Sequence, residues 1–159
     1  EKNFLKTLIS FKGLPHRQEL FYKKKNILFI NDSKATSFDS TKFALKNKKN
    51  IFWITGGLPK KGDKIKLGTL KKNIFKTYII GKHMKFFQKQ LNGKVNIKLC
   101  KNLKKAIVVI FQDIKKIKMN EKITILLSPA SASYDQYKNF EIRGDEFKKL
   151  VKLYAKKII

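Results

Sequence analysis

The chain has 159 residues, a formal net charge of +27 and one cysteine, and its length suits a single domain with one hydrophobic core. A lone cysteine, Cys100, excludes a disulfide framework and a thiolate metal cluster, and it favours a reducing, cytoplasmic compartment. No apolar run approaches the roughly 20 residues that a membrane-spanning helix needs, which excludes a membrane span.

The positive charge by itself favours a nucleic acid or another polyanion as partner. However, lysines occur in nearly every segment, and only Arg17 and Arg143 are arginines. Solvated surface lysines are therefore the favoured interpretation, and a basic nucleic-acid-binding α/β domain stays open as an alternative. Because the chain uses lysine almost everywhere, we expect the two arginines at sites that need a planar, forked cation.

Hydrophobic periodicity predicts strands and helices that alternate after an opening hairpin. The predicted strands are Arg17–Tyr22, Asn26–Ile30, Ile51–Thr55, Thr77–Ile80, Val95–Leu99 and Ile123–Leu127. The predicted helices are Thr36–Lys46, Leu67–Phe75, His83–Leu91, Leu103–Lys116 and Asp145–Ile158. This order predicts an α/β, Rossmann-like fold with a mostly parallel sheet of about six strands, helices on both faces and an antiparallel edge hairpin.

Polar residues gather just past the ends of three predicted strands, where open α/β sheets bind ligands. After the strand that ends at Ile30, the side chains of Asp32, Lys34 and Thr36 suit a ribose hydroxyl, a phosphate and a carboxylate, respectively. The alternative is a turn in which Asp32 or Thr36 only caps the next helix.

The second loop begins at Gly56 and Gly57 and carries Lys60 as its candidate binding residue. It is not a P-loop, because Asp63 stands where the lysine of that motif must be. An ordinary strand-to-helix turn is the alternative.

The third loop, Ser128–Gln136, is a run of small hydroxyl-bearing residues that lets a ligand approach the backbone closely. It lacks the G-x-S-x-G elbow of serine hydrolases, so it predicts binding rather than nucleophilic attack. Beyond it, the alternative to a binding role is that Asp145 caps the closing helix and Phe140 packs in the core.

Taken together, GLPHR at Gly13–Arg17, FINDSKAT at Phe29–Thr36, WITGGLPK at Trp53–Lys60 and LLSPASASYDQYKNFEIRGDEF at Leu126–Phe147 closely resemble the carboxyl-terminal domain of the Mur ligase family. The resemblance covers essentially the whole chain and favours the branch that adds D-glutamate to UDP-N-acetylmuramoyl-L-alanine. It implies ATP-dependent amide formation through an acyl phosphate, in the peptidoglycan precursor synthesis that supports cell wall, cell shape and cell division.

The resemblance also implies roles for single residues. Arg17, Asp32 and Lys34 would face ATP, with Arg17 near the phosphates and Asp32 near the ribose. The residues implied around D-glutamate are Thr36, Lys60, Ser133, Tyr134 and Phe140. Lys60 would pair with a substrate carboxylate, although the variable Leu58–Pro59 pair leaves the register between Lys60 and Lys61 open.

By the same resemblance, residues 1–12 are a connector from a missing central domain and residues 13–159 are the Mur ligase carboxyl-terminal domain. The central domain would supply the P-loop and the Mg²⁺ ligands, and no certain catalytic residue or metal ligand is expected in this chain. The chain alone would be an inactive, monomeric closing lid that excludes water from the acyl phosphate. Another Mur ligase or a folylpolyglutamate synthase-like domain, which accept other amino acids, remains the nearest alternative.

Overall fold

A computed structural model describes residues 13–117 and 121–158 of the chain. Within them, six strands form one sheet in the order β1-β2-β6-β3-β4-β5. The strands are β1 (Glu19–Lys24), β2 (Ile27–Asn31), β3 (Ile51–Gly56), β4 (Ile74–Ile80), β5 (Ile97–Lys101) and β6 (Ile123–Leu127). The helices are α2 (Phe38–Lys46), the 3₁₀ helix η1 (Gly68–Asn73), α3 (Met84–Leu91), α4 (Leu103–Lys116) and α5 (Phe140–Ile158).

The sheet is parallel except for β1, which pairs antiparallel with β2 at one edge. The last strand, β6, returns to the centre and lies between β2 and β3. The carboxyl ends of β2, β6 and β3 are therefore neighbours. In open α/β sheets such a change in strand order opens a crevice at the carboxyl edge, which is where ligands bind.

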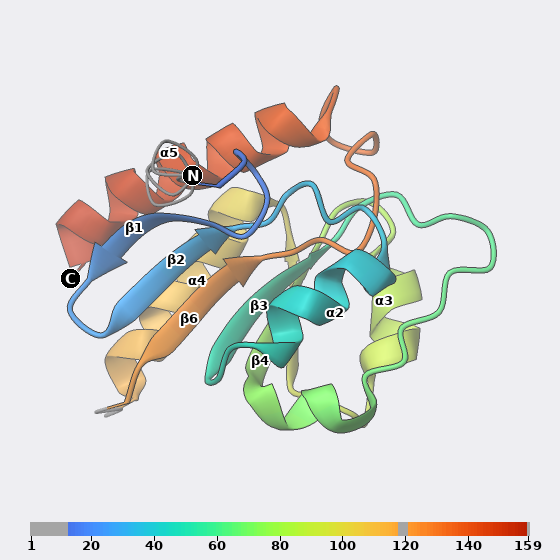
Figure 1. Ribbon diagram of the computed structural model, residues 1–159, viewed down its shortest axis with the longest axis horizontal. Helices are drawn as coiled ribbons and strands as arrows, with labels where there is room; N and C mark the ends of the chain where they lie inside the picture. The colour runs from blue at the N-terminus through green and yellow to red at the C-terminus, as the bar shows by residue number, and fades with distance from the viewer. Residues whose placement is uncertain (1–12, 118–120, 159) are drawn as a thin grey trace, which may run out of the picture.

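Helices cover both faces of the sheet, with α4 and α5 on one face and α2 and α3 on the other (Figure 1). Under α4 and α5 the strands present Phe29, Phe52 and Tyr78 to the core. On the other face, Trp53 and Ile79 pack with residues of α2 and α3. All residues of β3 and β6 are buried. Central parallel strands are covered on both faces, so their sequences are mostly apolar and do not alternate between apolar and polar residues.

The predicted fold class is confirmed, including the edge hairpin. Some predicted boundaries were wrong. The first strand starts at Glu19 rather than Arg17, because His16 and Gln18 adopt positive φ and form a turn. The strand predicted at Val95 begins at Ile97, and β4 extends back to Ile74.

The largest correction concerns the closing helix, which begins at Phe140 and not at Asp145. Asn139 Oδ1 accepts a hydrogen bond from Ile142 N at 2.9 Å, so Asn139 rather than Asp145 caps this helix. Gly144 disfavours a helix by propensity, which is why the sequence pattern misplaced the start. The packing around Gly144, described below, explains why a glycine lies there.

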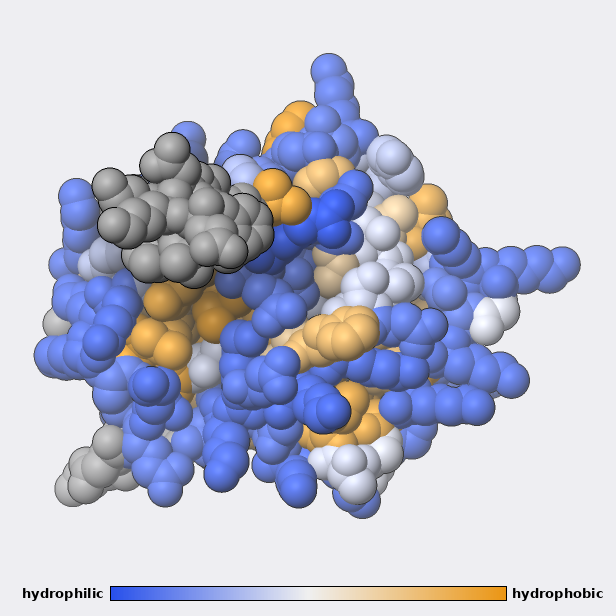
Figure 2. All heavy atoms as spheres, viewed as in Figure 1, coloured by the Kyte–Doolittle hydropathy of each residue, from blue (hydrophilic) through white to orange (hydrophobic). Residues whose placement is uncertain are grey.

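No helix of the described residues is both long enough and apolar enough to cross a membrane. Hydrophilic side chains cover most of the face seen in Figure 2, with apolar side chains in scattered patches. Hydrophilic side chains are therefore spread over this face rather than gathered in one stripe.

Candidate ligand-binding rim

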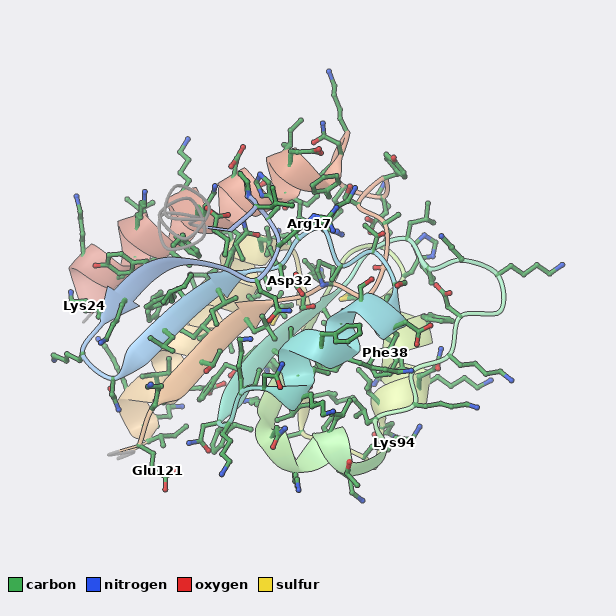
Figure 3. The ribbon with its side chains drawn as sticks, viewed as in Figure 1. Arg17, Lys24, Asp32, Phe38, Lys94 and Glu121 are labelled. Carbon is green, nitrogen blue, oxygen red and sulfur yellow. The ribbon has the colours of Figure 1, made fainter. Side chains whose placement is uncertain are left out.

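Four segments meet at the carboxyl edge of the sheet and form what we call the rim. They are the turn at 13–18 and the loops at 32–37, 57–63 and 128–139, which follow β2, β3 and β6. Arg17 and Asp32 lie together at this edge, whereas Glu121 lies at the opposite end of the sheet (Figure 3). The predicted convergence of the polar loops on one edge is thus a feature of the structure.

Two hydrogen bonds bracket Arg17 and fasten its turn to the loop after β2. Lys34 N donates to His16 O at 3.0 Å, and Gln18 N donates to Asp32 Oδ1 at 3.1 Å. The Arg17 side chain itself is exposed. Its backbone is therefore fixed while its guanidinium remains available.

The loop after β6 is joined to the loop after β2 through Asp32. Ser128 Oγ donates to Asp32 Oδ2 at 2.7 Å and lies 2.9 Å from Thr41 Oγ1 of α2. A backbone bond from Ala130 N to Ala35 O at 3.0 Å continues the contact. Asp32 is thus neither a helix cap nor a solvated carboxylate, since α2 is capped by Ser37.

The loop after β3 contacts the loop after β6. Leu58 pairs with Ala132 in an antiparallel bridge, with Leu58 N donating to Ala132 O at 2.8 Å. Gly57 has a φ of 138°, and a Cβ there would overlap Ala132 O and meet Ser131 Oγ at 2.7 Å. Glycine is required because two backbones approach too closely for a side chain.

Arg143 of α5 braces these loops from below the rim. It is only 1 % exposed, and its Nε donates to Ser33 Oγ at 3.0 Å. One terminal nitrogen, Nη2, donates to Ser33 O at 2.9 Å and to Ser131 O at 3.1 Å. Burial lowers the pKa of Arg143 to about 10, so it stays charged at neutral pH. The expectation that Arg143 fills a site for a forked cation is confirmed.

A second buried cluster holds the turn that carries Arg17. His16 is 7 % exposed, and Asn31 Nδ2 lies 3.0 Å from His16 Nδ1 and 3.0 Å from Glu19 Oε2. A Cβ on Gly144 would overlap His16 Nδ1 and meet both Asn31 amide atoms at 3.0 Å. The glycine therefore lets α5 pass close to His16, which in turn places Arg17.

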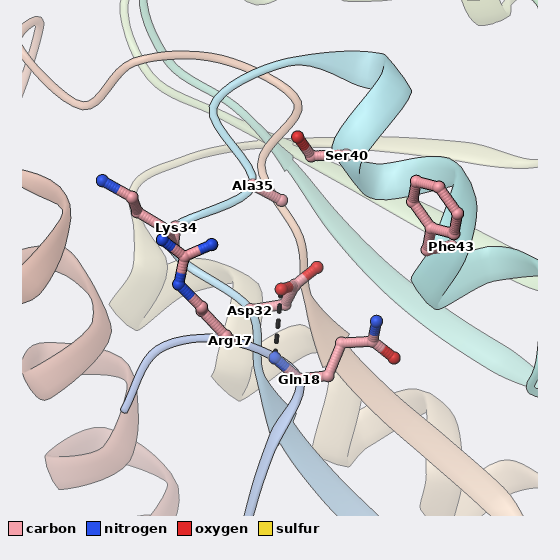
Figure 4. Close-up of a pocket in the computed structure, with 7 residues that line it drawn as sticks. All are labelled: Arg17, Gln18, Asp32, Lys34, Ala35, Ser40 and Phe43. Atoms are coloured by element: carbon pink, nitrogen blue, oxygen red, sulfur yellow. Dashed lines mark hydrogen bonds between the residues drawn. The ribbon is translucent and has the colours of Figure 1, made fainter. Parts of the chain in front are cut away.

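A pocket of about 320 Å³ opens where the turn and the loop after β2 meet (Figure 4). It is lined by Arg17, Gln18, Asp32, Lys34, Ala35, Ser40 and Phe43. Burial raises the pKa of Asp32 from its usual value, against the opposing effects of its hydrogen bonds to Ser128 and Gln18. A buried carboxylate beside exposed cations is a combination found at functional sites.

All three residues expected at ATP, namely Arg17, Asp32 and Lys34, line this one pocket. Lys34 Nζ lies 4.1 Å from the centre of the Phe140 ring, which is a cation–π contact. Phe140 also meets His16 edge-on at a centroid distance of 5.9 Å. Phe140 therefore contacts residues of the pocket rather than packing only in the core.

The other residues expected at D-glutamate lie on the joined loops but differ in exposure. Thr36 is half-buried, Ser133 is 2 % exposed, and Lys60 and Tyr134 are exposed. Lys60 N donates to Asp63 Oδ2 at 2.7 Å, which fixes the turn that carries Lys60. The structure thus brings the loops of these residues together, and Lys60 and Tyr134 point their side chains into solvent.

Sequence reasoning missed several residues of the rim, notably His16, Asn31 and Asp135. Asp135 Oδ2 accepts from Lys82 N at 2.8 Å and so ties the loop after β4 to the rim. His16 lies inside GLPHR and Asp135 inside the SPASASYD block, so the motifs contained both. Only the fold shows that these side chains bind other loops.

No group of three or more His, Cys, Asp and Glu side chains in residues 13–117 and 121–158 is arranged to hold a metal ion. The residues of the pocket suit a nucleotide better than a metal ion. The pocket offers cations for phosphates and a desolvated carboxylate for hydroxyl donors, with both oxygens of Asp32 oriented by protein donors.

The Rossmann-like fold, with a polar rim at its topological switch point, agrees with the fold that the Mur ligase resemblance implies. No family model matches the chain. Individual proteins are similar to the chain, and those described next are UDP-N-acetylmuramoylalanine–D-glutamate ligases.

The ligase of Wolbachia sp. subsp. Brugia malayi (strain TRS) is 46% identical over 138 residues, which is 87% of this chain and 27% of the relative. The ligase of Nitrobacter hamburgensis is 43% identical over 145 residues, 91% of this chain and 31% of the relative. That of Rickettsia felis is 38% identical over 157 residues, 99% of this chain and 35% of the relative. The chain is homologous to the carboxyl-terminal part of these Mur ligases and spans about a third of their length.

Proposed function

We propose that the chain is the amino-acid- and nucleotide-binding lid of a ligase that adds D-glutamate to UDP-N-acetylmuramoyl-L-alanine with consumption of ATP. The observation that carries the proposal is the single rim built from GLPHR, DSKAT, GGLPK and SPASAS, four motifs that lie far apart in the sequence. Relatives that carry this activity in their names support the substrate assignment.

Within this proposal the rim has two halves. Arg17 and Lys34 hold phosphates, and Asp32 accepts from the ribose. Thr36, Lys60, Ser133, Tyr134 and Phe140 surround D-glutamate, where Lys60 supplies a positive charge to one carboxylate. Phe140 lies between the halves through its contact with Lys34, so it couples the nucleotide to the amino acid.

The remaining parts of the reaction belong to preceding polypeptide in this proposal. Residues 1–12, which lie outside the residues that the structure describes, are proposed as a connector, and a central domain supplies the P-loop and the Mg²⁺ ligands. Magnesium would offset charge on the transferring phosphoryl group. The rim closes over that domain, orients the amine of D-glutamate and excludes water. The chain alone therefore binds ligands and does not turn them over.

A ligase assay on the full polypeptide tests the proposal. D-Glutamate should be accepted in preference to L-glutamate, L-lysine and diaminopimelate, and the isolated chain should release no phosphate. Replacement Lys60→Ala should lower kcat/KM for D-glutamate about thirtyfold, because a carboxylate loses its charged partner, worth about 2 kcal/mol.

Lys61→Ala is the matched control for Lys60, since both lysines are exposed and adjacent. It should change kcat/KM by less than about threefold, in line with the small effect of a solvated surface charge. If Lys61→Ala and not Lys60→Ala lowers kcat/KM, the register of this loop is shifted by one residue. If neither does, the loop after β3 does not bind the amino acid.

A further inference from the structure

The α2 helix exposes an aromatic ring beside the nucleotide pocket, and the residue roles above leave this ring unused. Phe43 is 65 % exposed, the most exposed phenylalanine of the described residues, whereas Phe38 of the same helix is 7 % exposed. A single exposed apolar side chain is ordinary on a protein surface. Phe43 differs because it lines the same pocket as Arg17, Asp32 and Lys34.

The pocket residues are arranged in a row. Arg17 and Lys34 lie on one side, Asp32 lies in the middle, and Phe43 lies on the other side, on α2 (Figure 4). A nucleotide presents the same sequence of groups, namely anionic phosphates, a ribose with hydroxyl donors and a flat apolar base. The order of the side chains therefore matches the order of the ligand's groups.

We propose that the Phe43 ring is the platform on which the base of the bound nucleotide stacks. The inference deepens the proposed function and rests on it. Aromatic stacking is tolerant of base identity because every base has a π-face. Phe43 thus adds affinity for the nucleoside without choosing between adenine and guanine.

The local structure fixes the part of α2 that carries this ring. Ser37 Oγ accepts from Ser40 N at 3.3 Å and caps α2 nearly two turns before Phe43. Thr41, two residues before Phe43, is fully buried and bonded to Ser128. The helix that carries Phe43 is therefore fixed to Ser128, which also holds Asp32, so the backbone of Phe43 is held beside the pocket.

Affinities of the isolated chain for three probes test the proposal: ATP, GTP and inorganic tripolyphosphate, measured by NMR titration. Phe43→Ala should weaken ATP and GTP about tenfold, equal to 1.4 kcal/mol, and leave tripolyphosphate unchanged. Phe43→Tyr, which keeps the ring, should restore both nucleotides. Leu153→Ala is the control. It also shortens an exposed apolar side chain, on α5, and should change none of the three affinities.

The outcomes separate this inference from the proposed function. Arg17→Ala should weaken all three probes, because it removes a phosphate contact. If Phe43→Ala leaves ATP affinity unchanged while Arg17→Ala lowers it, the stacking proposal is wrong and the nucleotide site stands. If ATP binding does not respond to Arg17→Ala, the proposed nucleotide site itself fails.

Discussion

Asp32 lowers the stability of the folded chain at neutral pH. Its proposed role as an acceptor for the ribose explains why a carboxylate is nevertheless buried there. Its carboxylate is 6 % exposed and its pKa is raised by burial, so the folded chain holds this proton more tightly than the unfolded chain. The contribution of this group to stability is therefore greatest below the ordinary pKa of 3.8 and falls as the pH rises through the raised value. At neutral pH the ionised group destabilises the fold.

Replacement Asp32→Asn tests this exchange of stability for binding. An amide can accept from Gln18 N and donate to Ser128 Oγ, which can then donate to Thr41, so the contacts survive. We expect the variant to be at least as stable as wild type at pH 7 in urea unfolding, with a weaker pH dependence. Its ATP affinity should fall about tenfold, because a charged acceptor for a ribose hydroxyl is lost.

Unchanged ATP affinity in Asp32→Asn, or a clear loss of stability at pH 7, would contradict this account of Asp32. A conservative change elsewhere serves as control. Asp39→Asn removes an 87 % exposed carboxylate that pairs with Lys42 on α2, and it should change stability by less than about 1 kcal/mol and leave ATP affinity unchanged.

At the scale of elements, α5 organises the rim through two consecutive residues, Arg143 and Gly144. Arg143 donates to the loops after β2 and β6, and Gly144 admits His16 beneath the Arg17 turn. The loops are polar and would be mobile if left to themselves. Their geometry is set by a helix that directly follows the loop after β6 and lies 110 residues from Ser33 of the loop after β2.

Arg143→Lys should therefore destabilise the chain although it keeps the charge. A lysine cannot donate to Ser33 Oγ, Ser33 O and Ser131 O together, and a buried ammonium with unmet donors is costly. We expect a loss of roughly 2–4 kcal/mol in the free energy of unfolding, measured by urea titration. Lys152→Ala, on an exposed position of the same helix, should change it by less than about 0.5 kcal/mol. A loss below about 1 kcal/mol in Arg143→Lys would mean that the brace is not needed.

The elements also show what the sequence could and could not predict. Strand β6 and helix α4 have the predicted bounds, because an apolar run and a strong helical period mark them. The start of α5 could not be predicted, since Gly144 and Asp145 read locally as a helix boundary. Glycine lies inside the helix because His16, 128 residues earlier, needs the space, and a local pattern does not contain that contact.

The candidate site divides in the same way. The loops could be predicted, since polar residues follow apolar strands, and the rarity of arginine predicted a site for a forked cation at Arg143, but not the loops that it contacts. The supporting contacts of His16, Asn31 and Asp135 could not, because they depend on the turn before β1 packing against the end of β2 and on the loops after β4 and β6 meeting at one edge. The order of elements in the sequence predicts which residue types lie at this edge. The contacts between loops at the edge follow only from the three-dimensional fold.

At the scale of the whole molecule, we propose that the rim is one half of a pocket for a nucleotide and an amino acid. The chain is strongly basic, so an anionic ligand has many competing sites on the surface. A meaningful test must locate binding rather than only detect it.

Backbone amide NMR of the chain, titrated with ATP and then with D-glutamate at physiological salt, provides that test. The account predicts shifts confined to residues 16–18 and 32–43 with ATP, and to residues 34–36, 57–61 and 130–140 with D-glutamate. Residues 24–27 and 121–122, at the amino edge of the parallel strands, should not respond. Shifts that follow surface lysines over the whole molecule, or that appear at the amino edge instead, would contradict the claim.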